Sequence, residues 1–320
     1  MDPHRQYRPN PGLRRFISSY APDWIITAFL WLVCSIVDNN VSGFKRQFSL
    51  TDTSLLYPYA VHQRVGVTAM YFICAGAPFV LQTLINLLTV RSWWDFHHST
   101  LGLFLSLALT GSITQTVKVT VGRPRPDAIS RCQPFPGSAD PVLGLSTVAI
   151  CTQTNMAMLE DGWRSFPSGH SSMSFAGLGF LSFYLAGKLH MFDRRGHASK
   201  AWLALTPLTG ASLVAISRTM DYRHHWEDVL TGSVLGLVLA YFAYRQYYPG
   251  LAAKSSHRPY TTRFDVNDVG DGFLQQGGRD EEGNGAMRGS VDECDEDEDE
   301  DVGLMNGVRK FGGAIVGGRR

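Results

Sequence analysis

The apolar residues of this chain gather in six long runs, and all six end before residue 249. The stretches without Asp, Glu, Lys or Arg are 24–37, 65–90, 96–117, 165–187, 201–217 and 229–244. A helix needs about 20 apolar residues to cross a hydrocarbon core of about 30 Å, and the second and third stretches satisfy this directly. The others reach that length when polar residues at their ends are included, because long side chains extend to the interface and helix tilt absorbs mismatch. Their extended ranges are 17–38, 170–188, 200–217 and 228–248.

The pattern predicts an all-α fold, a polytopic membrane helix bundle with six transmembrane helices in residues 17–248. A cytosolic N-terminal segment, 1–16, precedes it. Stretch 141–159 also lacks charge, but its six Ser, Thr, Gln and Asn side chains would be unpaired in hydrocarbon, so we expect an ordered loop there.

Residues 249–320 are predicted to be a disordered acidic C-terminal tail. Nine of the ten residues 292–301 are Asp or Glu, and a like-charged block of this kind cannot collapse. A calcium-binding loop is disfavoured, because the run lacks the mid-loop glycine and alternating ligands of an EF-hand.

The distribution of charge favours one orientation. The net charge of +1 gives no electrostatic reason to expect nucleic acid as a partner. With the N-terminus in the cytosol, the cytosolic segments near the membrane carry twelve Lys and Arg and the outer loops ten, a small excess in the expected direction.

Cys132 and Cys151 then share an outer loop, where an oxidising lumen permits a disulfide; two separate buried thiols are the alternative.

Three short stretches carry reactive and cationic side chains. They are KVTVGRPRP at 118–126, SFPSGH at 165–170 and SRTMDYRHHWED at 217–228. No predicted span lies between the first and the second, and two spans separate the second from the third. All three stretches are therefore expected on the same face of the membrane.

The first stretch offers cations at the end of a span. Lys118 could be a simple interfacial anchor or a ligand for an anion. Arg125 lies between Pro124 and Pro126, which hold the backbone extended and limit where the guanidinium points. Arginine suits bidentate phosphate contacts, whereas lysine acts as a point charge. Spacing alone does not separate Arg125 from Arg123.

The second stretch opens a helix. Either Ser165 or Ser168 is a natural N-cap for the apolar run that follows. Free backbone N–H groups at a helix N-terminus favour an anion, and Gly169 would let a phosphate oxygen approach closely. His170 is either a proton donor or an ordinary interfacial histidine.

The third stretch combines Arg218 with a histidine and a carboxylate. His224 and Asp228 are four residues apart, which on a helix places them on one face within reach of each other. The carboxylate could then hold the imidazole in one tautomer and leave the other nitrogen as a nucleophile. His225 at i+3 from Asp228, and Glu227 as a partner of His224, are alternatives. A metal site is disfavoured, because adjacent histidines point in different directions on a helix and no cysteine accompanies them.

The order KX₆RP, PSGH and SRX₅HX₃D resembles the three signature motifs of the type 2 phosphatidic acid phosphatase (lipid phosphate phosphatase) superfamily. The resemblance covers roughly 17–248, and the SFPSGHSS wording and the loop cysteines are most similar to the fungal and plant diacylglycerol pyrophosphate phosphatase group. The register of the motifs selects His224 over His225 and Arg125 over Arg123. The acidic tail matches no pattern of the family.

The resemblance implies a metal-independent phosphatase without a cofactor. His224, oriented by Asp228, would form a phosphohistidine, and His170 would protonate the leaving group. The expected phosphate-binding residues are Lys118, Arg125, Ser168, Gly169 and Arg218. The expected substrate is phosphatidic acid or diacylglycerol pyrophosphate, held at the lumenal or extracytoplasmic face of the endoplasmic reticulum, vacuole or plasma membrane. Phosphatases of sphingoid or polyisoprenyl phosphates share these residues, and a catalytically silent anion-binding or transport protein is the alternative outside the enzymes.

Overall fold

A computed structural model describes residues 11–193, 196–261 and 263, and the regular elements in them are helices. The long helices are α1 (Pro11–Asn40), α4 (Trp93–Val121), α7 (Gly169–Lys188), α8 (Ala198–Met220) and α9 (Trp226–Tyr247). One further long helix is a continuous segment of four parts, α2 (Val67–Tyr71), η2 (Phe72–Gly76), α3 (Ala77–Ile85) and η3 (Asn86–Val90). The short ones are η1 (Thr53–Leu55), α5 (Ala128–Cys132), η4 (Val148–Ile150) and α6 (Met156–Asp161). The predicted all-α class is confirmed.

Four of the helices in the described part are long and apolar enough to cross a membrane. They are Arg14–Asn40, Val67–Val90, Trp93–Val121 and Trp226–Tyr247. These multiple apolar helices are consistent with an integral membrane protein. α7 and α8 match two further predicted spans in position, but they are not among the four.

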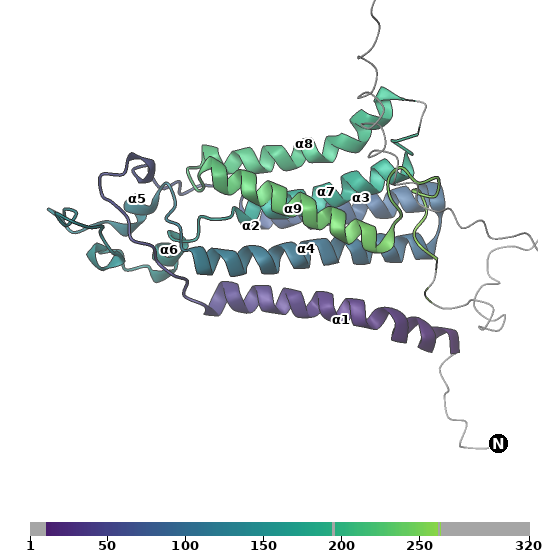
Figure 1. Ribbon diagram of the computed structural model, residues 1–320, viewed down its shortest axis with the longest axis horizontal. Helices are drawn as coiled ribbons and strands as arrows, with labels where there is room; N and C mark the ends of the chain where they lie inside the picture. The colour runs from purple at the N-terminus through teal and green to yellow at the C-terminus, as the bar shows by residue number, and fades with distance from the viewer. Residues whose placement is uncertain (1–10, 194–195, 262, 264–320) are drawn as a thin grey trace, which may run out of the picture. The chain divides into compact units, whose positions relative to one another are not determined.

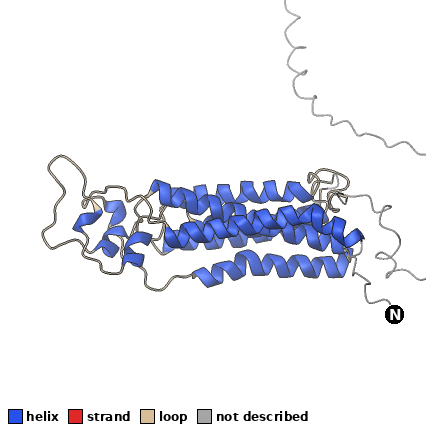
Figure 2. Ribbon diagram, turned by 90° about the horizontal axis from the view of Figure 1, so that it is seen from below, coloured by secondary structure: helices blue, strands red, loops and turns tan. Residues whose placement is uncertain are grey.

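The position of α7 explains its content of glycine and serine. It lies at the centre of the bundle and packs against α4, α8 and α9, while α1 packs on α4 (Figures 1 and 2). Small residues allow the helices to approach closely. A methyl group at Gly177 would overlap the Cys74 carbonyl, and one at Gly236 would overlap the Ser172 carbonyl. A helix surrounded by protein can carry glycine and serine where a lipid-facing helix needs apolar side chains.

A buried polar cluster joins the helices at the end where α4 begins. The Asp95 carboxylate accepts hydrogen bonds from Asn86, Tyr184 and Tyr248 and forms an ion pair with Lys188. Asp95 itself is fully buried. The cluster therefore fixes α4, α7 and the end of α9 to one another.

The residues after α9 continue this packing. Residues 251–258 form turns, Ser256 is buried, and the Tyr260 N–H donates to the Tyr247 carbonyl at 2.9 Å. Arg263 forms an ion pair with Asp23 of α1 at 2.8 Å. Order thus extends beyond the boundary expected at 248, and the rest of the predicted tail lies outside the described residues.

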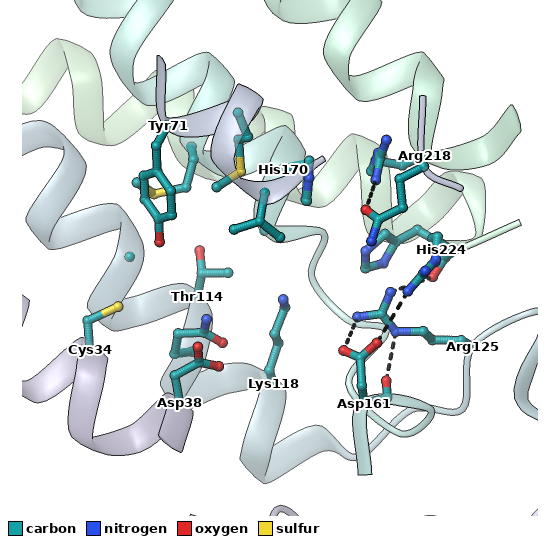
Figure 3. A pocket seen from close by; sticks show the side chains of 18 of the residues that line it. Cys34, Asp38, Tyr71, Thr114, Lys118, Arg125, Asp161, His170, Arg218 and His224 are labelled. Atoms are coloured by element: carbon teal, nitrogen blue, oxygen red, sulfur yellow. Dashed lines mark hydrogen bonds and ion pairs between the residues drawn. The ribbon is translucent and has the colours of Figure 1, made fainter. Parts of the chain in front are cut away.

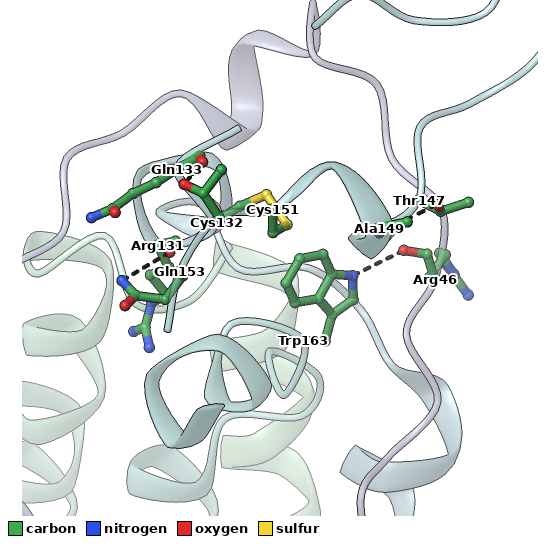
Figure 4. Close-up of a disulfide and its surroundings, with 10 residues drawn as sticks. Arg46, Arg131, Cys132, Gln133, Thr147, Ala149, Cys151, Gln153 and Trp163 are labelled. Carbon is green, nitrogen blue, oxygen red and sulfur yellow. Dashed lines mark hydrogen bonds between the residues drawn. A yellow bond between two sulfur atoms is a disulfide. The ribbon is translucent and has the colours of Figure 1, made fainter. Parts of the chain in front are cut away.

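The opposite end of the bundle carries a small folded loop region with α5 and α6 (Figure 1). Cys132 and Cys151 form a disulfide in it, which resolves the two alternatives for this pair (Figure 4). The Trp163 indole N–H donates to the Arg46 carbonyl at 2.9 Å, and the Trp163 ring packs against Phe48. Stretch 141–159 belongs to this region as loop, η4 and the start of α6, so it is not a span, as predicted.

Candidate active site

The three stretches predicted to share a face meet at the end of the bundle that carries the loop region. Backbone hydrogen bonds join them: Ser165 N–H donates to the Arg123 carbonyl at 3.1 Å, and Ser168 N–H donates to the Asp228 carbonyl at 3.0 Å. A cavity of about 200 Å³ opens beside them (Figure 3). Its charged and histidine side chains are Asp38, Lys118, Arg125, Asp161, His170, Arg218, Arg223 and His224, and the polar residues Gln63, Thr114 and Gln115 also line it.

Lys118 presents a free ammonium group to this cavity. It lies in the last turn of α4 and is 9% exposed, and among the residues that the structure describes none forms a hydrogen bond or ion pair with its Nζ. A Cβ atom at Gly169 would lie 3.0 Å from this Nζ. The absence of a side chain at Gly169 therefore keeps the space in front of the lysine open. A buried ammonium group without a partner is a candidate ligand for an anion that enters the cavity.

Arg125 is held by a residue that sequence reasoning missed. Its Nη2 forms an ion pair with Asp161 Oδ1 at 2.7 Å, and its Nε donates to the Asp161 carbonyl at 2.8 Å. The other oxygen of Asp161 accepts from Arg131 at 2.8 Å. Burial alone would raise the pKa of Asp161, but Arg125, Arg131 and Lys118 outweigh it and lower that pKa well below its usual range. A single carboxylate in a long loop carries no sequence signal for this role.

The second stretch begins α7 with Ser168, not Ser165, as the N-cap. The Ser168 side chain accepts a hydrogen bond from the Ser171 N–H, and Ser168 is fully buried. His170 lies in the first turn of α7. Its Nε2 is buried without a partner in the described residues and borders the cavity. A group that can donate or accept a proton therefore faces the space beside Lys118.

His224 lies in the turn between α8 and α9, because α9 begins only at Trp226. Its Nδ1 lies 2.7 Å from the Ser165 carbonyl and 4.0 Å from Asp228 Oδ2. The expected direct hydrogen bond to Asp228 is therefore not formed, since the i,i+4 geometry of a helix does not apply before the helix starts. A carbonyl can only accept, so Nδ1 carries the proton and Nε2 keeps its lone pair.

Asp228 acts one layer behind His224. It is fully buried and accepts from the Ser165 hydroxyl, from Arg123 at 2.7 Å and from the His225 N–H at 3.0 Å. His225 and Arg123 line a different hollow, whereas His224 and Arg125 line the cavity. The geometry therefore distinguishes His224 from His225 and Arg125 from Arg123, which the sequence spacing could not do.

Arg218 completes the cationic wall from the end of α8. Its Nη2 pairs with Asp221 and its Nη1 donates to the Gln63 side chain, each at 3.0 Å. Asp221 also forms an ion pair with Arg64 at 2.5 Å. Gln63 and Arg64 were not predicted, and they come from the segment before α2. Asp221 lies inside the third stretch, three residues after Arg218, a helical spacing that could have indicated it.

The cations also set the protonation of His224. Burial lowers the pKa of this imidazole well below its ordinary value, and the positive charges of Arg125 and Lys118 lower it further. The site therefore presents a neutral imidazole with a lone pair on Nε2 in a cavity that four cations line, Lys118, Arg125, Arg218 and Arg223. The described residues contain no group of three or more His, Cys, Asp or Glu side chains placed to hold a metal ion.

Comparisons with known proteins agree with this geometry. Residues 99–250 match the PAP2 superfamily. The chain is 40% identical to the probable diacylglycerol pyrophosphate phosphatase 1 of Schizosaccharomyces pombe, over 72% of this chain and 81% of that protein. It is 41% identical to lipid phosphate phosphatase 2 of Arabidopsis thaliana, over 71% and 77% of the two chains. It is 40% identical to diacylglycerol pyrophosphate phosphatase 1 of Saccharomyces cerevisiae, over 71% and 78%. No solved structure matches the chain.

Proposed function

Because this chain belongs to the PAP2 superfamily, we propose that it is a lipid phosphate phosphatase that hydrolyses phosphatidic acid or diacylglycerol pyrophosphate without a metal ion. The observation that carries the proposal is the neutral His224 beside Lys118, Arg125 and Arg218 in one cavity. Relatives from two yeasts are named diacylglycerol pyrophosphate phosphatases, which supports this substrate class.

The first chemical step is attack of His224 Nε2 on phosphorus. The N–P bond forms as the P–O bond to the lipid breaks, and its electron pair leaves with the lipid oxygen. Lys118, Arg125 and Arg218 stabilise the charge on the phosphoryl oxygens, helped by the backbone N–H group of Gly169 at the start of α7. The Ser165 carbonyl holds the Nδ1 proton throughout, and the Asp228 charge at 4.0 Å stabilises the phosphohistidine cation.

His170 moves the protons. Its Nε2 donates a proton to the departing oxygen, and in the second step it removes a proton from the attacking water. The N–P bond then breaks, its electrons return to His224, and inorganic phosphate leaves. A buried imidazole nitrogen beside the cavity is suited to both tasks.

We further propose that α7 and α8 also cross the membrane, giving six spans in residues 17–248 with segment 1–16 in the cytosol. The site would then face the lumen of the endoplasmic reticulum or vacuole, or the cell exterior. The disulfide beside the site supports this side, because disulfides persist in oxidising compartments.

The proposal is tested with purified full-length protein in detergent micelles containing phosphatidic acid. Inorganic phosphate should be released at an unchanged rate in excess EDTA, because fixed cations replace a divalent metal. Loss of activity in EDTA that Mg²⁺ restores would contradict the metal-free reaction. Lipid monophosphates and pyrophosphates, assayed side by side, identify the preferred substrate.

A further inference from the structure

The register of the three motifs leaves out one cation of the cavity. Arg223 directly precedes His224, lines the same cavity and is 6% exposed. Its N–H donates to the Arg218 carbonyl at 3.1 Å, and its own carbonyl accepts from Arg125 Nη1 at 3.4 Å. Figure 3 shows Arg218 and Arg125 on opposite sides of His224. Arg223 is therefore joined by hydrogen bonds to both arginines that flank the proposed nucleophile.

The segment before α2 fixes the Arg223 guanidinium group. Its Nη2 donates to the Ala60 carbonyl at 3.1 Å, and its central carbon lies 4.8 Å from the centroid of the Tyr59 ring. Arg131 contacts the same ring at 4.7 Å. An aromatic face attracts a cation without carrying a negative charge of its own, so Tyr59 holds Arg223 in place and leaves its charge unneutralised.

The ion pair that Arg223 forms with Asp161 is weak. Arg223 Nη1 lies 3.5 Å from Asp161 Oδ2, which is long for a hydrogen bond. That oxygen already accepts from Arg131 at 2.8 Å, and Asp161 Oδ1 pairs with Arg125 at 2.7 Å. Arg223 Nε is buried and has no hydrogen-bond partner among the residues that the structure describes. The guanidinium group thus keeps a donor and most of its charge for a ligand in the cavity.

The charge of the cavity wall shows what Arg223 adds. Four cations and two carboxylates line the cavity, which leaves a net charge of +2 beside the neutral His224. The cations are Lys118, Arg125, Arg218 and Arg223, and the carboxylates are Asp38 and Asp161. A phosphate monoester carries about −1.5 to −2 at neutral pH. The wall matches this charge with Arg223 and falls short of it by one without Arg223.

We propose that Arg223 is a fourth phosphate-binding residue, which donates to an oxygen of the transferred phosphoryl group and selects the doubly charged form of the substrate phosphate. This inference rests on the proposed function and adds a catalytic residue that the motif pattern does not contain. Arg218 and Arg125 bind the phosphoryl group from two sides of His224, and Arg223 supplies a further positive charge between them. Complementary charge of this kind selects between ligands of equal shape.

Two small anions of similar shape measure this selection. Methyl phosphate carries two negative charges at mildly alkaline pH, and methyl sulfate carries one. Their dissociation constants are measured by isothermal titration calorimetry with full-length His224→Ala protein in detergent micelles, so that neither anion is turned over. Adding Arg223→Gln should weaken methyl phosphate binding at least tenfold. The preference for methyl phosphate over methyl sulfate should fall at least fivefold.

Arg46→Gln is the matched control. Arg46 is an exposed arginine in the loop region at the same end of the bundle, and its side chain does not line the cavity. The same loss of charge there should leave both dissociation constants within twofold. Equal weakening of both anions by Arg223→Gln would show a structural role and overturn the proposal, as would unchanged binding of methyl phosphate.

Arg223→Lys provides a test that does not remove the buried charge, in case Arg223→Gln does not fold. Lysine keeps the positive charge but lacks the planar set of donors. The preference for methyl phosphate over methyl sulfate should therefore stay within twofold, while the affinity for methyl phosphate should fall at least threefold. An unchanged affinity would contradict the contact with the guanidinium group, and a lost preference would contradict the role of its charge.

These outcomes separate the inference from the proposed function. If the protein with His224 intact hydrolysed no phosphate ester, the proposed function would fail, while a changed anion preference in Arg223→Gln would still support Arg223 as a phosphate ligand. If phosphatidic acid were hydrolysed and the anion preference did not depend on Arg223, the function would stand and the assignment of Arg223 would be rejected.

Discussion

At the level of single residues, His224 depends on a backbone carbonyl for its orientation. The Ser165 carbonyl fixes the tautomer, and Asp228 holds the segment that carries Ser165. A carbonyl is present at every residue, so the side-chain sequence cannot indicate which one serves. The helical spacing of His224 and Asp228 therefore predicted correctly that the two residues lie near each other. It did not predict that a backbone carbonyl, and not the Asp228 carboxylate, contacts His224 Nδ1.

The two adjacent histidines should behave differently. His224→Ala is expected to remove turnover, by at least a thousandfold, because it removes the proposed nucleophile. His225→Ala should retain at least a tenth of wild-type kcat, since His225 does not line the cavity and its ring pairs with Asp228, which does not line the cavity either. Phosphate release and trapping of an acid-labile phosphoenzyme measure both. Equal losses in the two variants would contradict the assignment of His224.

Asp161 should act by positioning Arg125. Asp161→Asn removes the charge that holds Arg125 and Arg131, so kcat/KM is expected to fall tenfold to a hundredfold, about 1.4 to 2.7 kcal/mol. Competitive inhibition by inorganic phosphate should weaken in proportion, which a purely structural role would not produce. Asp161→Glu keeps the charge and should recover part of the loss. Unchanged phosphate inhibition in Asp161→Asn would argue against this role.

The lowered pKa of His224 predicts a shift in its titration. The imidazole should stay neutral well below the ordinary histidine pKa of about 6.5, because burial and neighbouring cations oppose the second proton. Lys118→Met removes one of those cations, so the pKa of His224 should rise and protonation should begin at a higher pH. NMR titration of ¹⁵N-labelled histidine measures this directly. A fall in the pKa after this substitution would contradict the electrostatic picture.

At the level of helices, sequence patterning located the elements better than their boundaries. Long charge-free runs indicated every long helix, because burial in lipid or protein requires apolar side chains over about 20 residues. The start of α9 after His224 was not predicted, since the polar turn before it has a helix-like spacing. α7 shows a further limit: its glycines and serines suit contact with protein on all sides, which a hydropathy average does not distinguish from a less apolar helix.

The residues missed at the site have one property in common. Asp161, Gln63 and Asp221 hold the arginines that reach the cavity, and two of them lie far from their partners in the sequence. Long-range pairing of this kind depends on how loops cross the end of the bundle. The motifs indicated which cationic side chains line the cavity, and only the fold shows which carboxylates and amides support them.

For the molecule as a whole, the two ends of the bundle have separate tasks. The Asp95 cluster fastens α4, α7 and α9 at the end opposite to the site. Asp95→Asn would leave Lys188 buried without a counter-charge, a loss of about 3–5 kcal/mol. We expect a thermal midpoint lower by at least about 5 °C, with kcat/KM of the folded fraction within threefold of wild type. Thermal unfolding and phosphate release on the same sample check this. A large loss of kcat/KM without loss of stability would show that the ends are coupled.

The loop disulfide bears on the stage of maturation at which the proposed active site is complete. Arg131, which shares Asp161 with Arg125, is the immediate neighbour of Cys132. The disulfide is therefore one residue away from a side chain that helps to hold Asp161 and, through it, Arg125. In a newly synthesised chain whose loop cysteines are still reduced, Arg131 would be held less firmly. Asp161 and Arg125 would then be less well fixed, and we expect weaker binding of phosphate. If the site faces an oxidising compartment, as proposed, formation of the Cys132–Cys151 bond would complete the support of Arg125 only after the loop has crossed the membrane.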